Sequence, residues 1–157
     1  MNILKNKGIS IIEILVVISL IILIASIVIP NLSEFKKQQA LKNTTEDIVS
    51  LLNEARNSTI SSKNSTTYGV HFEEDSATLF PGVSFADNVN NKQIDFDTST
   101  IISTDDGINL EGGGDDIVFE RLTGNVANYG TIIVQLASDT TKTKTISVSS
   151  IGVVSVN

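Results

Sequence analysis

The sequence predicts an α+β fold, in which one long, bent N-terminal α-helix packs against a C-terminal head of antiparallel β-strands. Three features indicate this fold. An apolar run covers residues 9–29, and a helical spacing of apolar residues follows from Leu32 to Ala55. Short strand-like runs, each bounded by turn residues, then continue to the end of the chain. With 157 residues, the chain has room for one modest globular domain and an appendage.

The apolar run is long enough to cross a membrane. As a helix it would span roughly 30 Å, which is the thickness of the hydrocarbon core of a bilayer. Lys5 and Lys7 precede it, and basic residues next to a span favour the cytoplasmic side. We therefore expect a single-pass segment with a cytoplasmic N-terminus and an extracytoplasmic head. The polar residues within the run are Ser10, Glu13, Ser19 and Ser26.

Glu13 is the one ionisable residue of the apolar run. Inserting a carboxylate near the centre of a membrane-spanning helix costs about 2.5–3.5 kcal/mol on insertion scales. Such a residue therefore usually pairs with another group or has a functional role. An ordinary signal peptide would be cut after small residues, whereas residues 27–30 read Ile-Val-Ile-Pro. The alternative is an uncleaved signal-anchor helix, whose glutamate snorkels to the membrane surface or pairs within an unrelated bundle.

The stretch Lys7-Gly8-Ile9-Ser10-Ile11-Ile12-Glu13 resembles the type III signal of type IV pilins and pseudopilins, in which a basic leader ends in Gly and Glu is the fifth mature residue. The resemblance implies cleavage between Gly8 and Ile9 by a prepilin peptidase and N-methylation of Ile9, where the family more often has Phe. It also implies a pilin-like organisation. Its parts are a leader at residues 1–8, a transmembrane or filament-core helix at 9–29, an amphipathic helix at 30–62 and a β-rich head at 63–157.

By the same resemblance, Glu13 forms an assembly charge pair with the new α-amino group of a neighbouring subunit. Opposite charges about 4 Å apart attract by roughly 4 kcal/mol at an effective dielectric constant near 20, whereas either charge alone in lipid is penalised. Pro30 lies where such pilins commonly carry a proline. Because proline lacks a backbone donor and disfavours helical geometry in the preceding residue, we expect a helix kink or a short unwound piece there.

The head is expected to form one or two sheets over the second half of the helix, which should end between residues 57 and 63. Apolar residues alternate with their neighbours in 131–137 and again in 146–149, which indicates half-buried strands. The predicted strands are residues 67–72, 77–80, 93–96, 100–103, 117–120, 131–137, 144–149 and 153–156. The head is also similar to the GspH/FimT group of minor pseudopilins, in residues 52–57, in 117–119 shortly before Gly124, and in the pair 145–149 and 152–156.

Composition narrows the possible functions. The formal net charge is −7, which disfavours general attraction to nucleic acid, whose phosphates are met by Lys and Arg. There is no cysteine, and therefore no disulfide, thiolate metal site or cysteine nucleophile. No G-x-S-x-G elbow, P-loop or H-E-x-x-H motif is present, so we expect no catalysis and no cofactor.

Three further features are candidates for sites. The segment TDDGINLEGGGDD holds the carboxylates of Asp105, Asp106, Glu111, Asp115 and Asp116. Calcium prefers such oxygen ligands, but the spacing differs from an EF-hand loop, and a solvated connection is the alternative. His71 has no partner at metal or triad spacing, which favours a structural or exposed side chain. Arg56 is predicted late in the helix, at the surface or in a pair between subunits.

The resemblance implies a structural subunit, a minor pilin or pseudopilin of a type IV pilus or type II secretion pseudopilus. Its partners would be other pilin or pseudopilin subunits, the prepilin peptidase, the inner-membrane assembly platform and, before assembly, membrane lipid. It would lie in the inner membrane and then in a periplasmic or extracellular filament. The alternatives are a tip-located minor pilin for adhesion or DNA uptake, and a membrane-tethered enzyme.

Overall fold

The computed structural model describes residues 9–86, 89–103 and 107–157, without the side chains of residues 28–31. The chain divides into two units, Met1–Lys36 and Lys37–Asn157. Helix α1 spans Ile11–Ile60 and contributes residues to both units. We call the second unit the head. The predicted α+β class, with a long N-terminal helix and an antiparallel β region, is therefore confirmed.

Helix α1 begins two residues later than predicted and ends within the predicted window. The Ser10 carbonyl accepts the backbone N–H of Glu13 at 3.0 Å and that of Ile14 at 3.3 Å, which starts the helical hydrogen-bond pattern. After Ile60 comes the 3-10 turn η1 (Lys63–Ser65). The helix assignment continues through Pro30, and a kink there stays a prediction.

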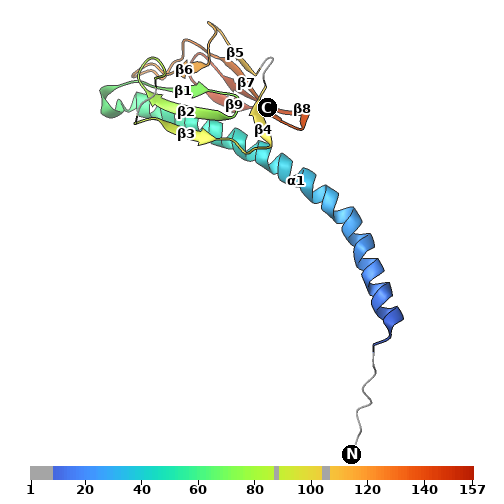
Figure 1. Cartoon of the computed structure of the whole chain (residues 1–157). Helices are drawn as coiled ribbons and strands as arrows, with labels where there is room; N and C mark the ends of the chain where they lie inside the picture. Colours follow the sequence, from blue (N-terminus) through green and yellow to red (C-terminus); the bar gives the residue numbers. More distant parts are fainter. Residues whose placement is uncertain (1–8, 87–88, 104–106) are drawn as a thin grey trace, which may run out of the picture. The chain divides into compact units, whose positions relative to one another are not determined.

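Two antiparallel sheets form the β part of the head (Figure 1). The four-stranded sheet has the order β3-β2-β1-β6, with β3 at Lys92–Asp95, β2 at Ser76–Pro81, β1 at Tyr68–Phe72 and β6 at Asp116–Val118. The five-stranded sheet has the order β4-β7-β8-β9, and β5 pairs with β7. Its strands are β4 (Thr100–Ile102), β5 (Ile108–Leu110), β7 (Gly130–Leu136), β8 (Asp139–Val148) and β9 (Val154–Val156).

Each of the eight predicted strands overlaps an observed one, but two features were not predicted. Strand β5 is only three residues long and lies between turns, so its sequence shows no alternation of apolar and polar residues. It is a strand because it pairs with β7, where Ile108 lies opposite Ile132. Strand β8 begins at Asp139 rather than at residue 144, because its polar first half pairs with β7. Pairing of backbone groups, rather than burial of side chains, extends this strand.

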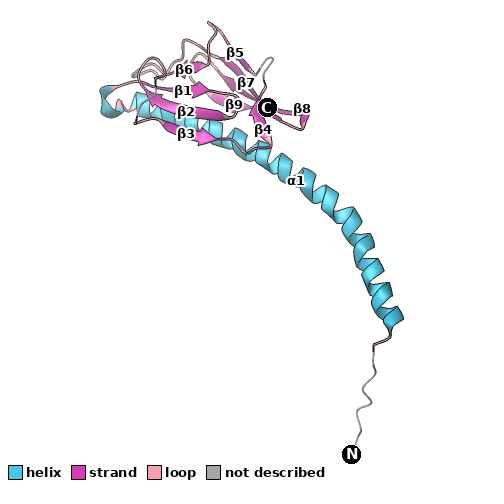
Figure 2. Cartoon of the chain, viewed as in Figure 1, coloured by secondary structure: helices cyan, strands magenta, loops and turns pink. Residues whose placement is uncertain are grey.

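One hydrophobic core joins the helix to both sheets, which gather on the C-terminal part of α1 (Figure 2). The helix contributes Leu41, Ile48, Leu51, Leu52 and Ala55. The sheets contribute residues such as Phe72 and Phe119, which are 2% and 0% exposed. Burying a large aliphatic or aromatic side chain stabilises a fold by about 1.5–3 kcal/mol. Leu32 and Phe35 share the helical spacing but belong to the other unit and are exposed.

Buried hydroxyl groups connect α1 to the strands. The Thr59 hydroxyl accepts the backbone N–H of Tyr68 at 2.8 Å and lies 3.4 Å from the carbonyl oxygen of the same residue, to which it donates. The hydroxyls of Thr44 and Thr100 share a hydrogen bond of 3.0 Å. Because buried polar groups are costly without partners, these bonds help to hold the strands at specific turns of the helix.

Candidate functional site

The predicted processing site lies at the start of the described chain. Gly8 falls outside the described residues, whereas Ile9 is described, precedes α1 and is 72% exposed. Glu13 is an exposed residue in the first turn of the helix. Negative charge is favoured at that position, because unpaired N–H groups and the helix dipole leave partial positive charge there.

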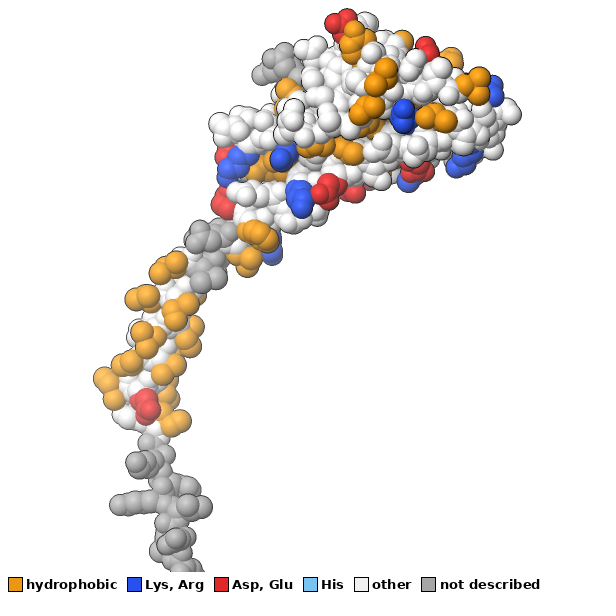
Figure 3. All heavy atoms as spheres, turned by 180° about the vertical axis from the view of Figure 1, so that it is seen from behind, with side chains coloured by type: hydrophobic (Ala, Val, Ile, Leu, Met, Phe, Trp, Pro, Cys, Tyr) orange, Lys and Arg blue, Asp and Glu red, His pale blue; other side chains and the backbone are white. Residues whose placement is uncertain are grey.

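The first part of α1 is covered with exposed apolar side chains. Figure 3 shows hydrophobic atoms over the visible face of this segment. The large hydrophobic residues from Ile9 to Ile27 are all at least 48% exposed. The helix is long and apolar enough to span a membrane, and none of its most apolar stretch is buried within the chain.

Hydroxyl groups within this apolar segment are bonded to their own helix. The Ser19 hydroxyl donates to the carbonyl oxygens of Leu15 and Val16, both at 2.9 Å. The Ser26 hydroxyl donates to the carbonyl oxygen of Leu23 at 2.8 Å. Such bonds satisfy polar hydrogens in surroundings without water. Among the described residues of this segment, Glu13 is the only one with a formal side-chain charge.

The acidic loop is only partly described, since Asp105 and Asp106 lie outside the described residues. Glu111 and Asp115 are exposed. Asp116 begins β6, and its Oδ1 atom accepts a hydrogen bond of 2.6 Å from Nδ1 of His71. In the part of the chain that the structure describes, no three His, Cys, Asp or Glu side chains are grouped to hold a metal ion. Calcium binding stays a prediction without support from these residues.

His71 lies in a small polar and aromatic cluster on the four-stranded sheet. Its ring stacks on that of Phe85, with 4.0 Å between centroids and 6° between planes. The second oxygen of Asp116 accepts the backbone N–H of Phe85 at 3.4 Å. Glu73 is 3.9 Å from the other ring nitrogen. The imidazole thus positions the β2–β3 loop, and in the described residues no hydroxyl nucleophile is bonded to it.

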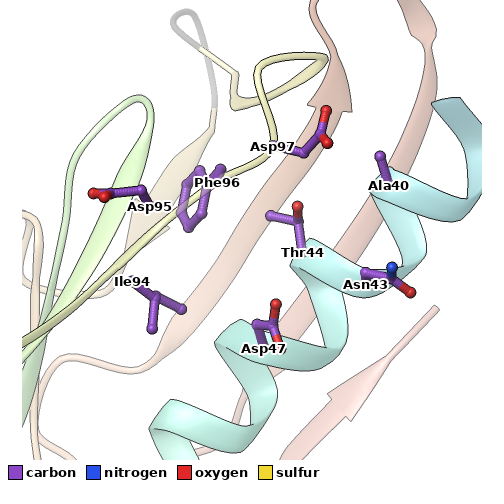
Figure 4. Close-up of a pocket in the computed structure, with 8 residues that line it drawn as sticks. All are labelled: Ala40, Asn43, Thr44, Asp47, Ile94, Asp95, Phe96 and Asp97. Atoms are coloured by element: carbon purple, nitrogen blue, oxygen red, sulfur yellow. The ribbon is translucent and has the colours of Figure 1, made fainter.

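A hollow of about 220 Å³ lies between α1 and the segment that follows β3 (Figure 4). Helix residues line one side, and the other side comes from the end of β3 and the loop after it. Its lining residues are Ala40, Asn43, Thr44, Asp47, Ile94, Asp95, Phe96 and Asp97. We call this feature the acidic hollow. It is smaller than the roughly 300–1,000 Å³ typical of small-molecule sites.

The carboxylates of the acidic hollow have no basic partner in the described part of the chain. The side-chain hydroxyl of Ser99, and next its backbone N–H, lower the pKa of Asp97 below the ordinary value of 3.8. The side-chain amide of Gln93 donates to Asp95 at 2.8 Å. Sequence reasoning missed this site, because Asp47 and Asp95 lie 48 positions apart and neither segment carries a recognisable motif.

No family model, curated protein or solved structure matches this chain. The resemblance of residues 7–13 to a pilin signal therefore stands as a hypothesis.

Proposed function

We propose that this chain is a structural subunit of a helical filament, a minor pilin or pseudopilin of a type IV pilus or type II secretion pseudopilus. In this proposal a prepilin peptidase removes residues 1–8 and methylates Ile9. The subunit waits in the inner membrane with its head outside the cytoplasm, and the assembly platform then transfers it into a filament. Its partners are other pilin or pseudopilin subunits, and the head supplies no catalysis.

The observation that carries the proposal is the combination of an apolar, unshielded helix with one acid near its start. A surface of exposed apolar side chains along residues 9–27 needs lipid or other helices around it. The same face can pack against lipid before assembly and against neighbouring helices afterwards. The helix therefore has apolar surroundings both in the membrane and in the filament.

Glu13 gives this packing its register. The acid sits in the first turn of α1, four residues after Ile9. Cleavage before Ile9 would create a positive α-amino group, and this group on one subunit can neutralise Glu13 on the next. Two opposite charges without partners are costly in apolar surroundings, and pairing removes that cost for both.

Mass spectrometry of the mature chain from cells with a prepilin peptidase tests the processing step. We expect loss of residues 1–8 and one added methyl group on the amino group of Ile9. A mature chain that keeps its leader would overturn the proposal.

A pair of variants tests the role of the acid. Glu13→Ala should still insert into the membrane and should be processed, but it should fail to enter filaments, because the α-amino group of its neighbour loses its partner. Ser19→Ala is the matched control, since Ser19 bonds only to its own helix backbone. It should enter filaments normally. Normal incorporation of Glu13→Ala would reject the charge pair.

A further inference from the structure

The corner of the head where α1 ends exposes a group of apolar side chains. They are Ile60, Leu122, Ile151 and Val153, with 36%, 79%, 60% and 51% of their surfaces exposed. Together with Arg56 we call them the exposed corner. Figure 3 shows hydrophobic side chains beside basic ones toward this end of the head. The fully buried core of a protein interface is more apolar than the rest of the surface, and arginine is enriched there.

Close packing of two glycines brings the members of this corner together. A Cβ atom at Gly124 would lie 2.7 Å from Cδ1 of Ile60 and 3.2 Å from Nε of Arg56. At Gly152 it would lie 2.0 Å from the Gly124 carbonyl oxygen and 3.0 Å from Nε of Arg56. Both glycines have positive φ, at 68° and 73°. The two turns therefore approach the helix more closely than side chains would allow.

Leu122 is unfavourable for the isolated head in two respects. Its φ is +70°, in the left-handed region that costs a residue with a Cβ atom roughly 1–2 kcal/mol. Its apolar side chain also remains 79% exposed. An unfavourable backbone and an exposed leucine at the same position contribute nothing to the stability of the head. Such outliers concentrate where a surface has a function.

Arg56 supplies a charge, and the described residues of the head show no ion pair with its guanidinium group. Its Nε atom is buried without a hydrogen-bond partner, and among the described residues its hydrogen bond is a long one, 3.5 Å from Nη2 to the Ile151 carbonyl oxygen. A guanidinium group has five donors and binds carboxylates well. The exposed corner thus requires a partner with an apolar surface and nearby carboxylates.

The acidic hollow of the same chain has these properties. Ile94 and Phe96 provide apolar lining, and the carboxylates of Asp47 and Asp97 lie beside them without a basic partner among the described residues, whereas the Asp95 side chain points away from the helix (Figure 4). A volume of about 220 Å³ is enough for an aliphatic side chain such as leucine but small for a cofactor. Both features lie along α1, and Asp47 and Arg56 are about 14 Å apart at the helical rise.

We propose that the exposed corner of one copy docks into the acidic hollow of a second copy, with Leu122 in the hollow and Arg56 facing its carboxylates. The contact joins two different surfaces, so each copy can use both at once and the contact can repeat along a filament. The inference deepens the proposed function, on which it rests, by naming the surfaces through which heads meet.

Disulfide cross-linking of full-length chains tests this contact. The sequence contains no native cysteine, so every disulfide must join two introduced cysteines. Two versions with different tags, one with Leu122→Cys and one with Ala40→Cys on the helix side of the hollow, are co-expressed in cells with a prepilin peptidase and mildly oxidised. A disulfide needs Cα atoms within about 7 Å. We expect mixed-tag dimers, at least about five-fold above the pair Val83→Cys and Ala40→Cys, because Val83 is 80% exposed but is not one of the residues of the corner.

Charge variants then test the specificity of the contact. Arg56→Glu in the Leu122→Cys chain should lower the yield about five-fold, and Asp47→Arg in the other chain should restore it. Asp47→Arg alone, at an exposed helix position, should lower the yield without disturbing the corner. Mixed dimers at the control level, dimers only between Leu122→Cys chains, or a yield insensitive to these charges would overturn the contact.

The same samples separate this inference from the proposed function. Mixed dimers on chains that keep residues 1–8 would support the contact between copies while the filament proposal fails. Processed, methylated chains without mixed dimers would retain the filament proposal and reject the contact.

Discussion

The two parts of helix α1 have similar backbones and opposite surroundings. Residues 11–27 are apolar except for Glu13, Ser19 and Ser26, and their large hydrophobic side chains are exposed on all sides of the helix. From Leu41 to Ala55, apolar residues instead form one stripe, and the core of the head buries it. The comparison teaches that apolar content alone does not indicate what a helix packs against. A helix that is apolar all round needs lipid or other helices, whereas a one-sided helix can complete a domain within its own chain.

The largest expected difference between the two parts is in stability. Leu52→Ala removes a side chain with no exposed surface and should lower the free energy of unfolding of the head by about 2–5 kcal/mol, because it leaves a cavity. Ile18→Ala, at a position that is 48% exposed, should leave it unchanged within about 0.5 kcal/mol. Chemical denaturation of the full chain in detergent, followed by circular dichroism, measures both. Equal losses of unfolding free energy in the two variants would contradict the difference between the two parts of the helix.

Hydroxyl groups sharpen the same comparison. Thr59→Val keeps the shape of a fully buried side chain but leaves the Tyr68 N–H without its partner. We expect a loss of about 1–3 kcal/mol in the same denaturation measurement. Ser19→Ala should be nearly neutral, since its hydroxyl bonds only to the carbonyl groups of its own helix. A neutral Thr59→Val would show that the helix and β1 are held by apolar packing alone.

A smaller effect is expected at the surface of the head. A double-mutant cycle of His71→Ala and Phe85→Ala should give a coupling free energy of about 0.5–1.5 kcal/mol, because the two rings stack at 4.0 Å. Each single variant is compared with the double variant in the same unfolding assay. Additive losses would mean that the stack does not hold the β2–β3 loop.

The smallest expected effect concerns the acidic hollow. The pKa of Asp97 is lowered chiefly by the Ser99 hydroxyl, so Ser99→Ala should raise it toward 3.8. A lowered pKa in the folded state stabilises the fold above the unfolded pKa, and this stabilisation is lost as the pH falls through the folded value. The advantage of the original chain over Ser99→Ala should therefore be present at pH 7 and fade below about pH 4.

Carboxyl resonances in an NMR titration measure this change directly. Asp139 is the internal control, because Thr141 lowers its pKa in a separate hairpin. Its titration should not move in Ser99→Ala. An unchanged Asp97 would assign the shift to the backbone N–H of Ser99 instead.

Local pattern was enough to predict most elements of this protein. The saturated apolar run, the helical spacing from Leu41 to Ala55 and eight short strand-like runs bounded by turn residues identified α1 and every described strand except β5. These signals are local, because helices and strands place side chains with fixed periods. The residues proposed for processing and assembly, Gly8, Ile9 and Glu13, also form one continuous motif.

The tertiary structure was needed for every feature that brings together segments far apart in the sequence. Pairing with β7 made a strand of residues 108–110, and the fold brought Asp116 to His71 across 45 positions. The acidic hollow and the exposed corner each combine a helix face with distant loops. The physical reason is that hydrogen bonds, packing and charge act between neighbours in space, while periodicity in a sequence reports only the local backbone.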